Sequence, residues 1–207
     1  MNAQTRRFSI TGPAGVLECA LDLPEAAPRG VALVAHPHPL YGGTMDNKVA
    51  QTLARAFVAL GYATARMNFR GVGKSEGSYD AGNGETDDMA ALLAHMTREF
   101  AGLPVAFGGF SFGTVVLARL QQRLAESGGG AERLVLVGTA AGKWEVPPVP
   151  SNTMLIHGEH DETIPLAHVL DWARPQDLPV LVVPGADHFF HRKLQHIKNF
   201  VVESWHR

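Results

Sequence analysis

The chain has 207 residues, a length that most simply makes one domain with a sizeable hydrophobic core. Hydrophobic residues make up 45% of it and charged residues 18%, and 18 Lys and Arg against 20 Asp and Glu give a net charge of -2. This balance excludes the basic surface that nucleic-acid binding needs, and no run of like charges indicates a tail or a membrane patch. We expect a single domain over residues 1–207 that binds neither nucleic acid nor membrane.

The cysteine content and the lengths of the apolar runs indicate the cellular location of the protein. Cys19 is the only cysteine, so an internal disulfide is impossible and a reducing compartment is indicated. The N-terminal segment has two arginines but no apolar stretch long enough for a signal peptide. The longest apolar runs, at 31–35 and 180–183, are far shorter than the roughly 20 residues that a membrane span needs. These features predict a soluble, cytoplasmic protein.

Strand and helix patterns alternate along the chain. The segments RRFSIT and VLECALDL, separated by GPAG, predict an N-terminal antiparallel hairpin. Six later runs are apolar throughout, as in strands covered on both faces, and lie at 30–37, 62–69, 104–110, 133–138, 153–158 and 179–185. Helical patterns lie at 46–61, 86–102, 113–124, 165–173 and 192–205. The second of these has a cap-like residue, Thr86, at its start. The alternation predicts an α/β fold: a mostly parallel twisted sheet with helices on both faces, and ligands beyond the carboxyl ends of the strands.

The stretch NFRGVGKSEG, at 68–77, looks at first like the end of a phosphate-binding P-loop. That motif would need a glycine where the chain has Asn68, and a helix beginning at Lys74 and Ser75. Turn-forming residues follow instead, in EGSYDAGNG. Nucleotide binding is therefore not predicted.

The segment GGFSFG, at 108–113, contains the pattern G-x-S-x-G around Ser111. A strand pattern precedes it and a helix pattern follows, which is the context of a nucleophile elbow. Gly109 and Gly113 leave room for the strained serine backbone and for close packing. The elbow would present the Ser111 hydroxyl at a helix N-terminus, where developing negative charge is favoured. The structural alternative is a helix N-cap serine flanked by packing glycines.

A serine nucleophile needs a general base, and the base needs an orienting acid. After Ser111, the last two predicted strands each end in a fitting group. Asp161 lies in HGEHDETIP and His188 in GADHFF. The order Ser, Asp, His along the chain is the one expected of this elbow class. Glu159 and Glu162 remain alternative acids.

With these three loops the chain resembles the α/β-hydrolase superfamily almost from end to end. Residues 68–77 resemble the R-G-x-G-x-S-x-G turn of these enzymes, in which Arg70 and Ser75 would brace the turn. The stretch HPHPLYGGTMDNKV, at 36–49, is similar to that of small bacterial serine hydrolases without a lid domain. At the place where relatives carry a lid, residues 138–152 are too short and proline-rich for helices. The resemblance thus implies a lidless fold.

The resemblance also implies an oxyanion hole and a substrate pocket. One donor would be the amide of Phe112, and the second would come from the loop at 36–49. Because Pro37 and Pro39 have no N–H, either His38 or Leu40 supplies the second donor. The candidate pocket residues are Tyr41, Gly42, Gly43, Phe110 and Trp144.

The expected reaction is hydrolysis of carboxylic esters with small to medium acyl groups through an acyl-enzyme on Ser111. No cofactor is implied. His36 and His38 could be a metal pair, but no further ligand stands at metalloenzyme spacing, so no metal is expected either. The partner would be a small-molecule ester, and the sequence leaves the oligomeric state open. A thioesterase, a peptidase or an acyltransferase could use the same triad, and a non-catalytic binding scaffold could use the same fold.

Overall fold

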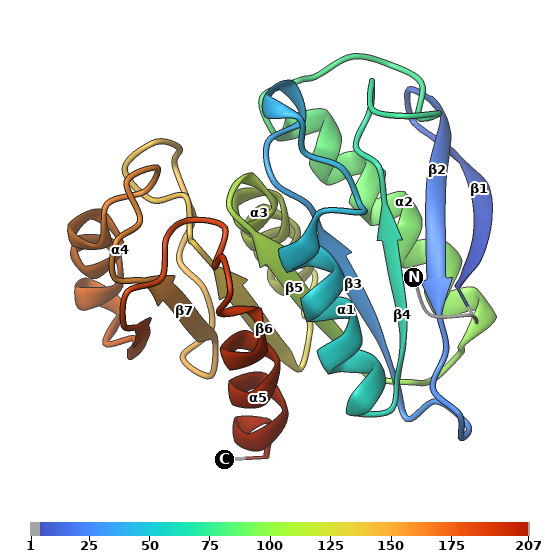
Figure 1. Ribbon diagram of the computed structural model, residues 1–207. Helices are drawn as coiled ribbons and strands as arrows, with labels where there is room; N and C mark the ends of the chain where they lie inside the picture. The colour runs from blue at the N-terminus through green and yellow to red at the C-terminus, as the bar shows by residue number, and fades with distance from the viewer. Residues whose placement is uncertain (1–4, 207) are drawn as a thin grey trace.

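The computed structural model describes residues 5–206 (Figure 1). Eight strands form one sheet in the order β1-β2-β4-β3-β5-β6-β7-β8. Strands β1 (Arg6–Gly12) and β2 (Gly15–Asp22) form an antiparallel hairpin, and β2 also runs antiparallel to β4. All the other neighbouring pairs are parallel. The predicted α/β fold with an N-terminal antiparallel hairpin is confirmed.

Each of the six apolar runs contains its strand. These strands are β3 (Gly30–Ala35), β4 (Tyr62–Met67), β5 (Val105–Phe110), β6 (Arg133–Val137), β7 (Met154–Gly158) and β8 (Val180–Val183). The α-helices are α1 (Lys48–Ala59), α2 (Asn83–Glu99), α3 (Phe112–Glu126), α4 (Leu166–Ala173) and α5 (Leu194–Ser204). Two 3₁₀ turns, η1 (Pro39–Tyr41) and η2 (Arg174–Gln176), complete the set.

Helices cover both faces of the sheet (Figure 1). Helices α1 and α5 pack side by side on one face, and α2 and α3 pack together on the other. Each face of the sheet has its own hydrophobic core, and the side chains of β3 alternate between the two. Leu33 packs on the α2 and α3 side, whereas Ala32 and Val34 pack on the α1 and α5 side. Because both faces of β3 are buried, its sequence is apolar throughout.

Helix α2 begins before the residue that the sequence suggested. It starts at Asn83, and Thr86 lies inside it, donating its hydroxyl to the Gly82 carbonyl at 2.6 Å. The start is fixed by the buried Glu85 carboxylate, which accepts the backbone N–H groups of Asp80 and Gly82 at 2.9 and 2.8 Å. Thr86 was therefore the wrong cap, because the helix begins three residues earlier and the Glu85 carboxylate satisfies the free amides before it.

The turn at 68–77 is closed by groups of the protein itself. Ser75 donates its hydroxyl to the Asn68 carbonyl at 2.7 Å and accepts the Glu18 N–H at 2.9 Å. Arg70 makes a two-pronged contact with the buried Asp88 carboxylate, at 2.7 and 2.8 Å. Arg70 and Ser75 thus brace a turn at the end of β4, and helix α2 begins only after it.

The connection between β6 and β7 carries no lid. Within residues 138–153 there is no helix, only a bridge between Ala141 and Trp144. The segment is tied to the α4 side of the molecule, since the Trp172 indole donates to the Val146 carbonyl at 2.9 Å. Across residues 5–206, moreover, no helix is long and apolar enough to cross a membrane.

Candidate active site

Ser111 lies between β5 and α3 in a strained backbone conformation. Its φ of 53° and ψ of -120° lie outside the regions that residues with a side chain normally adopt. The Ser111 N–H donates to the Val137 carbonyl at 2.9 Å, and the Thr114 hydroxyl donates to the Ser111 carbonyl at 2.6 Å. These two bonds hold the turn from both sides, at the carboxyl end of β5.

The two flanking glycines are required by close packing. A Cβ on Gly109 would lie 2.8 Å from the Gly113 carbonyl oxygen. A Cβ on Gly113 would lie 2.4 Å from the Ala35 carbonyl oxygen at the end of β3. The first turn of α3 can therefore approach the sheet only where both side chains are absent.

The structure brings Ser111, His188 and Asp161 together, as the sequence predicted. His188 Nε2 lies 3.0 Å from Ser111 Oγ, and His188 Nδ1 lies 2.7 Å from Asp161 Oδ2. With Nδ1–H donated to the carboxylate, Nε2 is left to accept the serine hydroxyl. All three residues are almost completely buried. This is the geometry of a nucleophile, a base and an orienting acid.

The alternative acids do not reach His188. Glu159 is exposed and accepts the Gly185 N–H at 2.7 Å, and Glu162 is also exposed. His157, which ends β7, instead supports the Asp161 loop. Its Nε2 donates to the Ile164 carbonyl at 2.8 Å, and burial lowers its pKa, so the ring is neutral.

The loop after β3 holds two amides of interest. The Leu40 N–H is already donated to His38 Nδ1 at 3.2 Å. Among the described residues, the N–H groups of His38 and Phe112 have no acceptor. Of the two predicted alternatives for the second oxyanion donor, this arrangement favours His38 over Leu40.

His36 is a structural residue below that loop. Its Nδ1 donates to the Pro37 carbonyl at 2.6 Å, and its Nε2 accepts the Phe69 N–H at 2.9 Å. Burial lowers the pKa of His36 to about 3, so the ring stays neutral. The described residues contain no group of three or more His, Cys, Asp or Glu side chains placed to hold a metal ion.

An aromatic cluster surrounds the His38 ring. Tyr41, Tyr79, Phe112 and Trp144 all have ring centroids within 4.7 to 5.3 Å of it. Tyr79 also binds His38 Nε2 through its hydroxyl at 3.1 Å. Sequence reasoning missed Tyr79, because nothing in the turn-rich segment after Ser75 distinguishes an aromatic residue that folds back onto the site.

The predicted pocket residues differ in how deeply they are buried and do not line one common surface. Tyr41 is 84% exposed at the rim, whereas Phe110 is fully buried and packs its ring 5.0 Å from that of His188. Gly42 has a φ of 78°, and a Cβ on Gly43 would lie 2.1 Å from the Pro37 carbonyl oxygen. Phe110 therefore packs against the His188 ring, while the glycines shape the loop.

A hollow of about 380 Å³ lies beside His188, between the loop that follows η1 and the loop that follows His188. Gly42, Lys48 and Val49 line one wall, and Phe189 and Arg192 line the other. The Phe189 ring stands at 80° to that of His188, with centroids 5.1 Å apart. We call this hollow the His188 pocket, because Phe189, which lines it, packs against the His188 ring.

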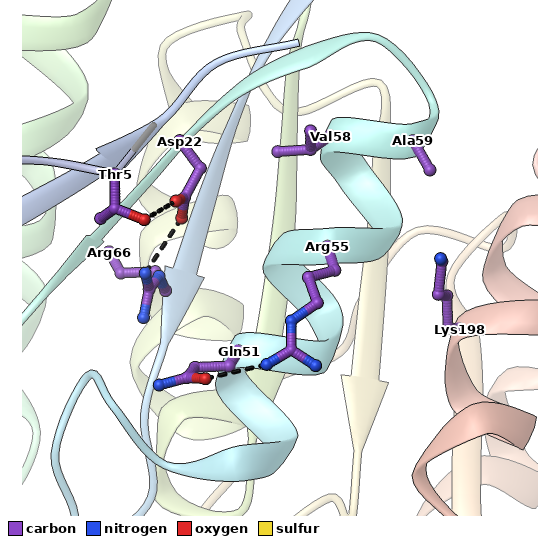
Figure 2. A pocket seen from close by; sticks show the side chains of 8 residues that line it. All are labelled: Thr5, Asp22, Gln51, Arg55, Val58, Ala59, Arg66 and Lys198. Carbon is purple, nitrogen blue, oxygen red and sulfur yellow. Dashed lines mark hydrogen bonds and ion pairs between the residues drawn. The ribbon is translucent and has the colours of Figure 1, made fainter. Parts of the chain in front are cut away.

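A second hollow, of about 270 Å³, is lined by side chains of α1, by Asp22 of β2 and Arg66 of β4, and by Lys198 of α5 (Figure 2). Asp22 there accepts hydrogen bonds from Thr5 at 2.5 Å and from Arg66 at 3.0 Å (Figure 2). Arg66 also donates to the Met45 carbonyl at 2.7 Å. The buried arginine thus supports the loop that leads into α1.

Comparisons with known proteins place the chain in a family and give structures of the same fold. A family model of serine aminopeptidases, S33, matches residues 27–177. A lidless α/β serine hydrolase from Xanthomonas campestris is 33% identical, with a TM-score of 0.89 over 99% of this chain and 96% of that one. An α/β serine hydrolase homologue from Coxiella burnetii is 34% identical, with a TM-score of 0.87 over 96% of each chain. An uncharacterized protein of Rickettsia prowazekii is 31% identical over 90% of this chain and 82% of its own length.

Proposed function

Because this chain belongs to the α/β-hydrolase family of serine hydrolases, we propose that it cleaves carboxylic esters of small to medium acyl groups. Ser111 is the nucleophile, His188 the general base and acid, and Asp161 the orienting acid. One observation carries the proposal: the continuous hydrogen-bonded chain from Ser111 Oγ through His188 to Asp161 Oδ2, at 3.0 and 2.7 Å.

In the acylation step, Ser111 Oγ forms a bond to the ester carbonyl carbon as His188 Nε2 takes the hydroxyl proton. The carbonyl oxygen becomes an oxyanion. When the tetrahedral intermediate collapses, the bond to the alcohol oxygen breaks and His188 returns the proton to that oxygen. The products are a free alcohol and an acyl-enzyme on Ser111.

In the deacylation step, water takes the place of the alcohol. His188 removes one proton from the water as its oxygen attacks the acyl carbon, and then returns that proton to Ser111 Oγ. The carboxylic acid leaves and the enzyme is restored. Throughout, the Asp161 carboxylate accepts a hydrogen bond from the Nδ1–H group of His188 and stabilises the imidazolium form.

The oxyanion would be held by the amides of Phe112 and His38. Both N–H groups lack an acceptor within the described residues, and Phe112 opens helix α3, whose dipole favours negative charge there. One such donor contributes roughly 3–4 kcal/mol to transition-state stabilisation. The buried neutral rings of His36 and His38 hold the loop in place.

Labelling with a fluorophosphonate and turnover of p-nitrophenyl acetate test the proposal. We expect the wild-type protein to label and to turn over. In Ser111→Ala, labelling should disappear and kcat should fall by about 10⁶-fold, since the triad acts as a unit. Ser127→Ala, at the exposed C-terminus of α3, is the matched control and should behave as wild type. A Ser111→Ala protein that still labels would place the nucleophile elsewhere, and a wild-type protein that does not label would favour a binding scaffold.

Amide hydrolysis is the second candidate, because the matching family model is one of serine aminopeptidases. An aminopeptidase must hold the ammonium group of its substrate, for which a free carboxylate is suited. In the His188 pocket, the described carboxylate is that of Asp46, and Arg7 binds both of its oxygens at 3.0 and 2.7 Å. A matched set of ester, thioester and arylamide substrates, with an added acceptor alcohol for acyl transfer, would rank these activities.

A further inference from the structure

In the proposed mechanism, the alcohol part of an ester leaves on the histidine side of the site. His188 Nε2 must deliver its proton to the alcohol oxygen, so that oxygen lies on the histidine side of the reacting carbon. The His188 pocket begins at Phe189, which directly follows His188 and packs against its ring. This inference rests on the proposed function, because it assigns a substrate class to the same site.

Two unpaired cations line this pocket. Lys48 and Arg192 come from opposite walls, and within residues 5–206 neither has a hydrogen-bond or ion-pair partner for its side chain. The remaining cationic candidate, His191, is bound by Asp187 at 2.5 Å. The pocket therefore offers positive charge that the protein itself does not neutralise.

The carboxylate of the pocket, Asp46, is already paired with two arginines of the protein. Arg7 binds it at 2.7 Å and Arg66 lies 3.4 Å from it. Arg66 is the buried arginine of Figure 2, and Asp22 also binds it. Asp46 is thus part of an ion-pair network behind the loop, and the pocket has a surplus of positive charge.

The turn that carries Arg192 has an unusual backbone conformation. Arg192 has a φ of 61° and Phe190 a φ of 52°, both in the left-handed region. The turn is held by the Lys193 N–H on the Phe190 carbonyl, at 2.8 Å, and by the fully buried Phe190 ring. Strained residues of this kind persist where the surrounding structure requires them, and they are concentrated at functional sites.

The remaining lining is apolar. Val49, Phe189 and Leu194 contribute hydrocarbon surface, and helices α1 and α5 both begin at this pocket. Helix N-termini add to a positive field. We propose that the His188 pocket binds the alcohol part of the substrate, and that this alcohol is an apolar or aromatic group carrying a carboxylate.

The test compares two esters of the same alcohol skeleton, 4-acetoxybenzoate and its methyl ester. Purified wild-type protein, Lys48→Gln and Arg192→Asn are assayed on both, and the readout is the ratio of kcat/KM for the anionic ester to that for the neutral ester. Asparagine is chosen because it tolerates a positive φ. Lys74→Gln, an exposed lysine of the turn after β4, is the matched control.

We expect each pocket variant to lower the ratio about two- to fivefold, mainly through KM, as for loss of one partly exposed ion pair. The neutral ester should be hydrolysed as by wild type, and Lys74→Gln should leave the ratio unchanged. In wild type, the ratio should also fall when salt is raised to about 0.5 M, because exposed charges are screened.

The outcomes separate the inference from the function on which it rests. If neither ester is hydrolysed by wild type, the proposed ester hydrolysis itself fails. If the methyl ester is hydrolysed but the ratio is the same in both variants and at high salt, the carboxylate inference is overturned. Equal losses on both esters would also overturn it, since they would indicate a structural role for these residues.

Discussion

Each oxygen of the Asp161 carboxylate has its own donors. Oδ1 accepts the N–H groups of Thr163 and Ile164, at 2.9 and 2.7 Å. Oδ2 faces His188 Nδ1 at 2.7 Å and lies 3.5 Å from His157 Nε2. The two backbone bonds fix the carboxylate before any substrate binds, so that the second oxygen is free to orient the histidine.

The variant Asp161→Asn should show whether activity needs the negative charge of Asp161 or only a hydrogen-bonding side chain in its place. The asparagine oxygen can keep the two backbone bonds, but its NH₂ group would then face His188 Nδ1 and favour the wrong tautomer. We expect kcat for p-nitrophenyl acetate to fall by about 10⁴-fold while the fold is kept. Glu162→Gln, exposed on the same loop, should retain full activity. A variant with more than a tenth of the wild-type kcat would remove Asp161 from the proposed role.

For single residues, the sequence predicted the site best where the order of groups along the chain indicates their chemical roles. The positions of Ser111, Asp161 and His188 after the strands β5, β7 and β8 predicted that they would meet, and they do. The choice between His38 and Leu40 could not be made, because it depends on how the His38 ring turns onto the Leu40 N–H. Side-chain rotation of this kind leaves no trace in residue spacing.

Among the elements, α3 makes a close backbone contact with the sheet near the site. Gly113 begins the packing of α3 against the end of β3, where an added Cβ would meet backbone atoms rather than a movable side chain. The strained Ser111 turn directly precedes that contact. The position of the helix therefore sets the position of the hydroxyl.

Gly113→Ala should move α3 away from β3. We expect a loss of about 1–3 kcal/mol in the free energy of unfolding, which is typical of overpacking, and a marked loss of kcat. Urea denaturation and p-nitrophenyl acetate turnover would measure the two effects. Gly129→Ala is the control, because its Cβ would meet only the Leu124 carbonyl oxygen, at an ordinary 3.6 Å. Equal stabilities of the two variants would contradict the packing argument.

The positions of the strands could be predicted from the sequence more accurately than the first residue of α2. A strand buried on both faces is mostly apolar, so β3 to β7 stand out directly, even though β4 carries the buried Arg66. The start of α2 depends on Glu85, a buried carboxylate that receives amides from the preceding turn. Because Glu85 is polar and lies among turn residues, the pattern placed the start too late, at Thr86.

For the molecule as a whole, three buried histidines link stability to pH. Burial lowers the pKa of His36, His38 and His157. Each is neutral in the folded protein and can take up a proton on unfolding, with an ordinary pKa near 6.5. A histidine whose folded pKa is lowered contributes stability above the unfolded pKa, and this stability is lost as the pH falls. The protein should therefore weaken progressively between pH 6.5 and about 3, the pKa of His36.

His36→Gln should flatten that dependence. For wild type, the His36 contribution between pH 7 and pH 5 amounts to about 2 kcal/mol of unfolding free energy. Urea denaturation at these two pH values should show a decrease for His36→Gln that is smaller by about this amount. His196→Gln, exposed on α5, should keep the wild-type decrease. Identical pH dependence in wild type and His36→Gln would show that His36 is not neutral and buried in solution.

The overall architecture was accessible from the alternation of strands and helices, but the sheet order was not. Sequence predicted a hairpin at the start, whereas β2 also pairs with β4, through partners such as Cys19 and Met67. That pairing joins segments far apart in the chain, and the apolar pattern of each strand would suit several neighbours. The site was predictable because it needs only the common carboxyl edge of the parallel strands, whatever their order.

The unlidded connection between β6 and β7 also bears on the fate of the acyl-enzyme. Enzymes that pass an acyl group to a second alcohol must keep bulk solvent away while the acceptor binds, and a closing segment commonly does this. Here residues 138–153 are tied to the α4 side, and no helix of that segment can fold over Ser111. In the proposed mechanism, this open connection makes solvent the most abundant acceptor, and we expect water to receive the acyl group.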